Sequence, residues 1–218
     1  MKIKAYWMTL LFLAVQLAAV LWLGYTLPPD RLVPSHWDIH GNVNGWMSRD
    51  VAIWVMYGVS ALIGLSIVAM PLYSVRYREH EEAFRRVMPR LSSLLVGFFA
   101  ILHVLSLWLA HHPYSTSGSR YIMLVIGLFF VGLGNLMPKI PGNFVAGVRT
   151  PWTLSSERVW RRTARVAAWG FVLAGLGMMV EAAFEPVPQW VAFVVVLPLL
   201  LSPMVLSFVF WLQDRRQS

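Results

Sequence analysis

Six long apolar runs divide this chain, and basic residues gather on alternate connections between them. The runs, in chain order, are 5–27, 51–73, 91–110, 121–137, 166–184 and 189–212. Each is long enough to cross a hydrocarbon core of about 30 Å as a helix. Hydrophobic residues make up 58% of the 218 residues and charged residues only 13%, too few to coat a water-soluble globule. The predicted fold class is therefore all-α, a polytopic transmembrane helical bundle.

Lysine and arginine residues predict the orientation of the spans. Of the 18, 15 fall on the N-terminus, the second and fourth connections and the C-terminal tail, and the other three are Arg31, Arg49 and Arg120. Because basic residues are retained on the cytoplasmic side, this split predicts six spans with both termini inside. The dispersal also argues against direct binding of nucleic acid, which needs one basic patch. It suits contacts with the headgroups of membrane lipids instead.

The outer connection, residues 28–50, carries more sequence information than a plain link needs. Its prolines predict an extended entry, and the dipeptides Gly41-Asn42 and Asn44-Gly45 predict turns with positive φ. Aromatic residues follow these elements at Trp37 and Trp46. We therefore expect a structured outer loop.

The inner connection, residues 138–165, is equally distinctive. A turn at Gly147 leads to Arg149 and a bend at Thr150-Pro151-Trp152. Ser155 is then expected to cap a helix that runs on into the fifth span, with Glu157 in its first turn. Arg149 has two interpretations, a contact with a lipid phosphate or a bidentate pair with Glu157.

Both connections resemble a known family. The outer loop resembles the small domain of unknown function that precedes the SdpI module in many bacterial membrane proteins, through Pro34, His36, Trp37, Asp38, Gly41, Gly45 and Trp46. The inner segment resembles the core of the SdpI module, through Gly147, Val148, Arg149, Thr150, Pro151, Trp152, Thr153, Leu154, Ser156, Glu157, Val159 and Trp160. The resemblance implies a two-span module at 1–75 and a four-span SdpI-like module at 76–218. The family often has Thr-His where this chain has Thr163-Ala164.

This resemblance implies an immunity or signal-transduction protein of the bacterial plasma (inner) membrane, without catalytic residues or a cofactor. It would give resistance to a secreted toxic peptide and sequester a cytoplasmic transcriptional repressor. The implied ligand-binding residues of the outer loop are His36, Trp37, Asp38, Gly41, Gly45 and Trp46. The implied inner-loop motif is Gly147, Arg149, Thr150, Pro151, Trp152, Ser156, Glu157 and Trp160. A purely structural role for this inner turn stands equally open.

A metal site is the alternative hypothesis. His36, Asp38 and His40 alternate, so an extended strand would point all three to one side. Two histidines and a carboxylate suit zinc or another divalent ion, in a metal-binding protein or a metal-dependent hydrolase. Asp38 could instead only cap a turn. A small transporter is disfavoured, because neither internal repeats nor a set of mid-membrane polar residues is visible.

Two ionisable residues fall within predicted spans. His103 is interpreted as a neutral imidazole hydrogen-bonded to a neighbouring helix, with Gln16 as the partner. The functional interpretation stays open, because ionisable groups inside a membrane often mark sites. Glu181 is expected to lie at the membrane interface rather than to be buried.

Overall fold

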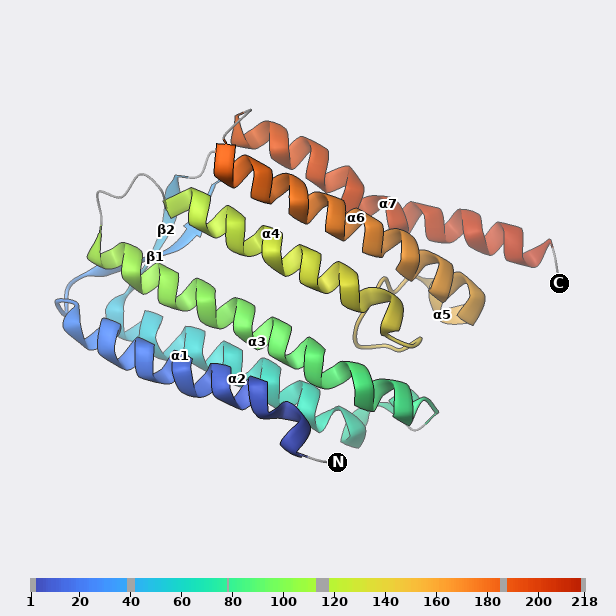
Figure 1. Ribbon diagram of the computed structural model, residues 1–218, viewed down its shortest axis with the longest axis horizontal. Helices are drawn as coiled ribbons and strands as arrows, with labels where there is room; N and C mark the ends of the chain where they lie inside the picture. Colours follow the sequence, from blue (N-terminus) through green and yellow to red (C-terminus); the bar gives the residue numbers. More distant parts are fainter. Residues whose placement is uncertain (1–2, 39–41, 78, 113–117, 185–187, 217–218) are drawn as a thin grey trace.

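The structure, a computed structural model, describes residues 3–38, 42–77, 79–112, 118–184 and 188–216 (Figure 1). Its long helices are α1 (Trp7–Thr26), α2 (Arg49–Tyr73), α3 (Glu81–His111), α4 (Gly118–Leu136), α6 (Glu157–Phe184) and α7 (Gln189–Arg215). Its short elements are η1 (Ile3–Tyr6), β1 (Leu32–Trp37), β2 (Val43–Ser48), η2 (Val75–Tyr77), η3 (Met137–Lys139) and α5 (Pro151–Ser155). Within the described residues, six helices are long and apolar enough to cross a membrane. The prediction of a six-span helical membrane protein is confirmed.

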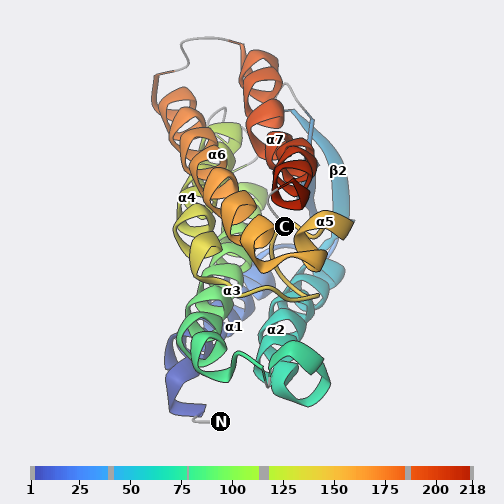
Figure 2. The same cartoon turned by 90° about the vertical axis from the view of Figure 1, so that its right-hand side faces the viewer.

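The helices form a bundle with two distinct ends. Helices α1, α3, α4 and α6 follow one another in one layer, and α2 and α7 both lie on one side of it, apart from each other (Figures 1 and 2). Helix α3 packs against α1, α2 and α4, and α6 packs against α4 and α7. The β1–β2 hairpin lies at one end, here called the hairpin end. Both termini, η2 and α5 lie at the other, here called the arginine end.

Glycines allow α4 and α6 to touch. A Cβ added to Gly127 would lie 2.7 Å from the carbonyl oxygen of Gly175, and one added to Gly175 would lie 2.5 Å from that of Gly127. Such close approach gives van der Waals contact between helices in lipid, where no hydrophobic force drives them together. Gly127 and Gly175 therefore form a close contact between the two helices. Gly177 takes no part in it, because its added Cβ would meet nothing within 4 Å.

Two helices begin well before the apolar runs that they contain, 91–110 in α3 and 166–184 in α6. Helix α3 starts at Glu81, which pairs with Arg85 at 3.8 Å, and Glu82 pairs with Arg86. Helix α6 starts at Glu157 and runs without a break into the fifth span. Pairs of opposite charge four residues apart support the exposed turns of both helices.

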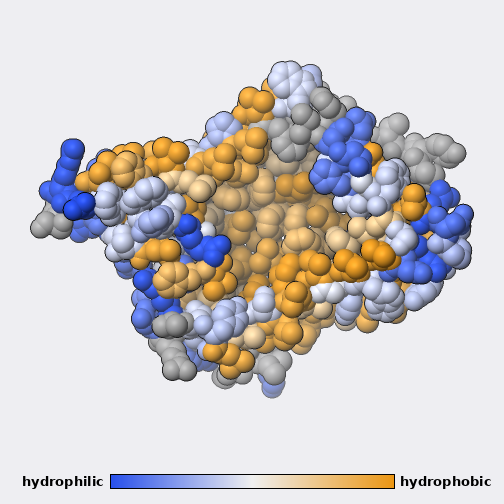
Figure 3. Space-filling model, turned by 180° about the vertical axis from the view of Figure 1, so that it is seen from behind, coloured by the Kyte–Doolittle hydropathy of each residue, from blue (hydrophilic) through white to orange (hydrophobic). Residues whose placement is uncertain are grey.

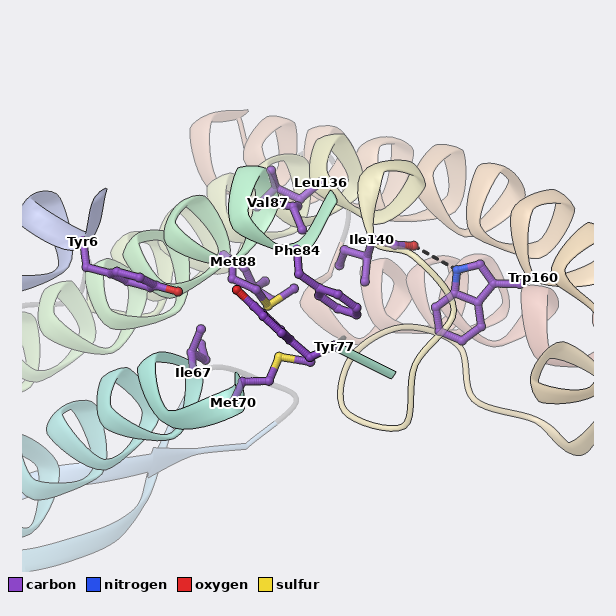
Figure 4. Packing of buried hydrophobic residues seen from close by; sticks show 11 residues of the cluster. Tyr6, Ile67, Met70, Tyr77, Phe84, Val87, Met88, Leu136, Ile140 and Trp160 are labelled. Atoms are coloured by element: carbon purple, nitrogen blue, oxygen red, sulfur yellow. Dashed lines mark hydrogen bonds between the residues drawn. The ribbon is translucent and has the colours of Figure 1, made fainter. Parts of the chain in front are cut away.

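A buried hydrophobic cluster at the arginine end joins the two predicted modules (Figure 4). Tyr6 and Met70 come from residues 1–75, whereas Tyr77, Phe84 and Trp160 come from 76–218. The rings of Tyr77 and Phe84 stack with their centroids 5.4 Å apart. The two modules therefore share one core at this end.

Candidate functional site

At the hairpin end, β1 and β2 pair antiparallel within the expected structured loop. Pro34 lies opposite Trp46 and His36 opposite Gly45, with an irregular register around His36. Asn44 and Gly45 belong to β2, so the predicted turn with positive φ at this dipeptide is wrong. Gly45 provides clearance instead, because a Cβ there would lie 2.8 Å from the Cβ of His36.

The predicted metal ligands have partners inside the hairpin. Oδ1 of Asp38 accepts a hydrogen bond from the backbone N–H of Asn42 at 2.9 Å, so Asp38 caps the turn. Nδ1 of His36 is hydrogen-bonded to Oδ1 of Asn44. The third predicted ligand, His40, lies outside the described residues. Among the residues that are described, no group of three or more His, Cys, Asp or Glu is placed to hold a metal ion. The metal hypothesis stays a prediction.

The hairpin is fixed to the helix ends below it. Val33 is buried in a cluster with Ile53 of α2 and Leu107 of α3. The hydroxyl of Ser106, also on α3, donates a hydrogen bond to the carbonyl oxygen of Pro34. Apolar burial and a buried backbone contact together hold β1 in one position over the bundle.

A pocket of about 320 Å³ lies between the hairpin and the helices. Its wall combines β1 and β2 with residues of α2, α3, α4 and α6. Three of the implied ligand contacts line it, namely His36, Trp37 and Asp38. Trp46 is 54% exposed on β2 and does not line the pocket. Gly41 lies outside the described residues.

Four methionines contribute to the apolar wall of this pocket. Met47, Met56, Met123 and Met178 come from β2, α2, α4 and α6 respectively. Methionine side chains are flexible and polarisable, and they are common at surfaces that adapt to different ligands. Sequence reasoning missed this set because its members are far apart along the chain. No periodic pattern links them.

His103 of α3 brings a polar group to the pocket wall. Its side chain is 1% exposed, and its Nδ1 lies 3.0 Å from Nε2 of Gln16 on α1. The predicted partner of His103 is therefore confirmed. Nε2 of Gln16 also donates to Oγ of Ser60 on α2 at 3.0 Å. Nε2 of His103 makes no hydrogen bond to any described residue.

At the arginine end, the side chain of Asn143 organises the inner loop. This residue is fully buried. Its Nδ2 donates to the carbonyl oxygens of Pro141 and Ala146 at 2.7 and 2.9 Å. Its Oδ1 accepts from the backbone N–H groups of Val145 and Ala146 at 2.6 and 2.7 Å. Sequence reasoning did not single out Asn143, although asparagine is a typical turn-forming residue.

The Thr-Pro-Trp bend begins helix α5. Oγ1 of Thr150 accepts from the N–H of Thr153 at 3.2 Å, and Oγ1 of Thr153 accepts from the N–H of Thr150 at 2.9 Å. This reciprocal cap is followed by Pro151, which suits the first helical turn. The prediction that Ser155 caps the next helix is wrong, because Ser155 is the last residue of α5. Ser156 has an extended backbone and separates α5 from α6.

The inner motif is clamped onto the C-terminal half of α7. Oγ of Ser156 donates to the carboxylate of Asp214 at 2.7 Å, and Arg158 pairs with the same carboxylate at 3.3 Å. The ring of Trp152 lies 4.9 Å from that of Phe208, centroid to centroid. The motif residues therefore have structural partners along one helix.

Arg149 does not pair with Glu157. Its Nη1 donates to the carbonyl oxygen of Phe144 at 2.6 Å, whereas Glu157 pairs with Arg161 at 3.1 Å. The favourable spacing within α6 places Arg161 one turn from Glu157, which explains the preference. Arg149 and Phe144 are both exposed. A contact of Arg149 with lipid phosphate or with a partner stays a prediction.

Glu181 is buried, which corrects the expectation of an interfacial position. Glu181 is 3% exposed, and its Oε1 has no hydrogen-bond partner among the described residues. Closeness to a span end says nothing about which face of a helix carries the residue. Here that face of α6 is covered by its neighbours.

Comparisons with known proteins agree with the two resemblances. Residues 139–209 match the SdpI/YfhL protein family, and residues 11–61 match a domain of unknown function, DUF1648. The immunity protein SdpI of Bacillus subtilis (strain 168) is 35% identical over 71 residues, which cover 33% of this chain and 34% of that protein. The chain thus aligns with about a third of this relative's length. No solved structure matches.

Proposed function

We propose, because residues 139–209 match the SdpI/YfhL protein family, that this chain is a bacterial membrane immunity protein that binds a secreted toxic peptide at its hairpin end. The observation that carries this proposal is the methionine-rich pocket under the hairpin. Apolar side chains of a peptide would fit this pocket, because a concave apolar pocket with a few polar groups is the usual form of a binding site.

The position of the pocket supports this role. Trp37 and Met47 close it on the hairpin side, and Met56 and Leu102 line it on the helix side. The predicted orientation of the spans places this end outside the cell, where a secreted peptide arrives. Large aromatic side chains such as Trp37 bury much area at low entropic cost and often dominate binding energy.

Protection of living cells tests this proposal. A sensitive bacterium expressing the chain would be challenged with the secreted peptide encoded beside its gene. Wild-type protein should restore growth, and Trp37→Ala should weaken protection, since loss of such an anchor costs about 2 kcal/mol or more in binding, roughly thirtyfold. Filling the pocket with Met56→Trp should also remove protection. Val55→Trp is the matched control, because Val55 is 53% exposed on the same helix.

The outcome against the proposal is equally clear. If the wild-type chain inserts normally and gives no protection, the immunity role fails. If Met56→Trp and Val55→Trp protect equally well, the pocket is not the site. Membrane levels of each variant must match those of the wild type.

We further propose a cytoplasmic partner at the arginine end, such as a transcriptional repressor. Here the support is an exposed patch beside buried residues that anchor the inner loop. Phe144 is 56% exposed and Val145 38%, beside the exposed Arg149. Thr150, Asn143 and Trp160 hold the loop in place, so they would serve as its scaffold. A regulator should co-purify with wild-type protein and be lost with Phe144→Ser, whereas no co-purifying regulator, or one retained by the variant, would refute this.

A further inference from the structure

The hydrogen bonds around His103 determine which ring nitrogen carries the proton. The hydroxyl of Ser60 donates to the carbonyl oxygen of Met56 at 3.2 Å, so its oxygen can only accept from Gln16. The Gln16 atom that contacts Ser60 is therefore the amide NH₂, and the same NH₂ lies 3.0 Å from Nδ1 of His103. Nδ1 must then be the acceptor. A neutral imidazole carries its one proton on the other nitrogen, Nε2.

The Nε2–H group of His103 has no protein acceptor within the described residues. The backbone of Ala52 lies beside the ring and interacts with it, but no atom of the described residues forms a hydrogen bond with Nε2 within the usual limits of distance and angle. His103 and Ala52 both line the pocket. A buried donor without a partner is unfavourable, and a ligand that supplies an acceptor removes this cost. His103 thus has two roles. Its Nδ1 joins α3 to α1 through Gln16, and its Nε2–H is available as a donor to a ligand.

We infer that the pocket holds an apolar segment of the peptide, and that Nε2–H of His103 donates a hydrogen bond to a backbone carbonyl or terminal carboxylate oxygen of that segment. This inference rests on the proposed function and adds the chemical class of the buried part of the ligand. The methionine wall takes apolar side chains of various shapes. The single donor favours a ligand that places an acceptor beside Nε2. One polar contact of this kind fixes the orientation of a ligand in an apolar pocket.

An apolar hollow lies on the face of the bundle that α2 and α7 border. Figure 3 shows this face with a hollow lined by hydrophobic residues, and Figure 2 shows α2 and α7 on the same side of the main layer. Helix α7 packs mainly against α6, and α2 packs against α3 and α1. An apolar segment dissolved in the membrane would meet an apolar surface on this face of the bundle.

A binding measurement with matched His103 variants tests the contact. The full chain, reconstituted in phosphatidylcholine nanodiscs, would be titrated with the synthetic apolar hexapeptide Leu-Val-Ile-Gly-Leu-Phe, acetylated and with a free carboxylate. His103→Asn keeps an acceptor near the position of Nδ1 but lacks the pocket donor. His103→Gln instead keeps an N–H donor near the position of Nε2. Ser60→Ala disturbs Gln16 without changing the pocket.

The result is the affinity of each variant for the hexapeptide, relative to that of the wild type. Loss of the donor in His103→Asn should weaken binding about tenfold, the effect of one buried hydrogen bond. His103→Gln should stay within about threefold of wild type, and Ser60→Ala should bind normally even if it is less stable. The inference is overturned if His103→Asn binds as well as wild type. It is also overturned if all three variants weaken together, because the ring would then be only structural.

Two further outcomes count against the inference. If wild-type protein binds dodecanoic acid but not the hexapeptide, the pocket is a lipid site. If it binds neither compound, the pocket does not hold an apolar peptide segment. Protection of cells tests the proposed function, whereas the ratio of the peptide affinities of His103→Asn and His103→Gln tests this contact. Each can therefore fail without the other.

Discussion

The indole of Trp160 lies against Gly147, so closely that a Cβ on this glycine would fall 2.8 Å from Cη2 of the ring. Gly147 has a φ of 117°, a backbone conformation that other residues rarely adopt. The same indole donates through Nε1 to the carbonyl oxygen of Ile140 at 2.9 Å (Figure 4). One tryptophan therefore holds both ends of the inner loop.

Replacing this glycine should destabilise the protein. In Gly147→Ala, the positive φ and the contact with Trp160 together should cost about 2 kcal/mol or more. Thermal unfolding in detergent should show a lower midpoint, by roughly 2–4 °C per kcal/mol for a chain of this size. Gly177→Ala is the control, because its added Cβ meets nothing within 4 Å. An unchanged midpoint in Gly147→Ala would mean that the loop does not depend on this contact.

The hydrogen bond between His36 and Asn44 gives a test of the metal hypothesis. If His36 acts only within the hairpin, His36→Ala and Asn44→Ala should lower stability by a similar amount, about 1 kcal/mol. Metal content measured by mass spectrometry should be the same in both variants and in wild type. A metal ion held in near-stoichiometric amount by wild type and Asn44→Ala, but lost in His36→Ala, would instead establish a metal site.

The orientation predicted by the 15-to-3 division of basic residues can be measured directly, because the chain has no native cysteine. Single cysteines at Ser35 and Ser155 would lie at opposite ends of the bundle, and both positions are exposed. In intact cells, an impermeant thiol reagent should label the first and leave the second unmodified until lysis. Labelling of Ser155→Cys from outside would reverse the assignment of the two ends.

The sequence was sufficient for features that depend on local pattern. Apolar runs predicted the six long helices, and the expected helix with Glu157 in its first turn is present. The partnership of Gln16 with His103 could also be inferred, since each is a rare polar residue in a span and needs a partner in lipid. What could not be predicted depends on contacts across the bundle. The presence of Met47 and Met178 in one pocket wall, the burial of Glu181 and the strand position of Gly45 all follow from tertiary packing, which overrides local propensity.

The helix starts at the arginine end show the same limit on a smaller scale. Ser155 and Ser156 are both reasonable caps by composition, and Thr150 is another. The reciprocal hydrogen bonds of Thr150 and Thr153 begin a short helix one turn earlier than the predicted start. Asp214 then engages Ser156 from α7. Only the position of α7 decides between these alternatives.

Photo-cross-linking of the secreted peptide tests the central claim most directly. A photoreactive phenylalanine analogue would replace Met56, which lines the pocket, or Val55, which faces away from it and is 53% exposed. After illumination of intact cells with labelled peptide, the account predicts a covalent adduct from position 56 that excess unlabelled peptide suppresses, and none from position 55. Equal adducts from both positions, or adducts only from position 55, would contradict binding in the pocket beneath the hairpin.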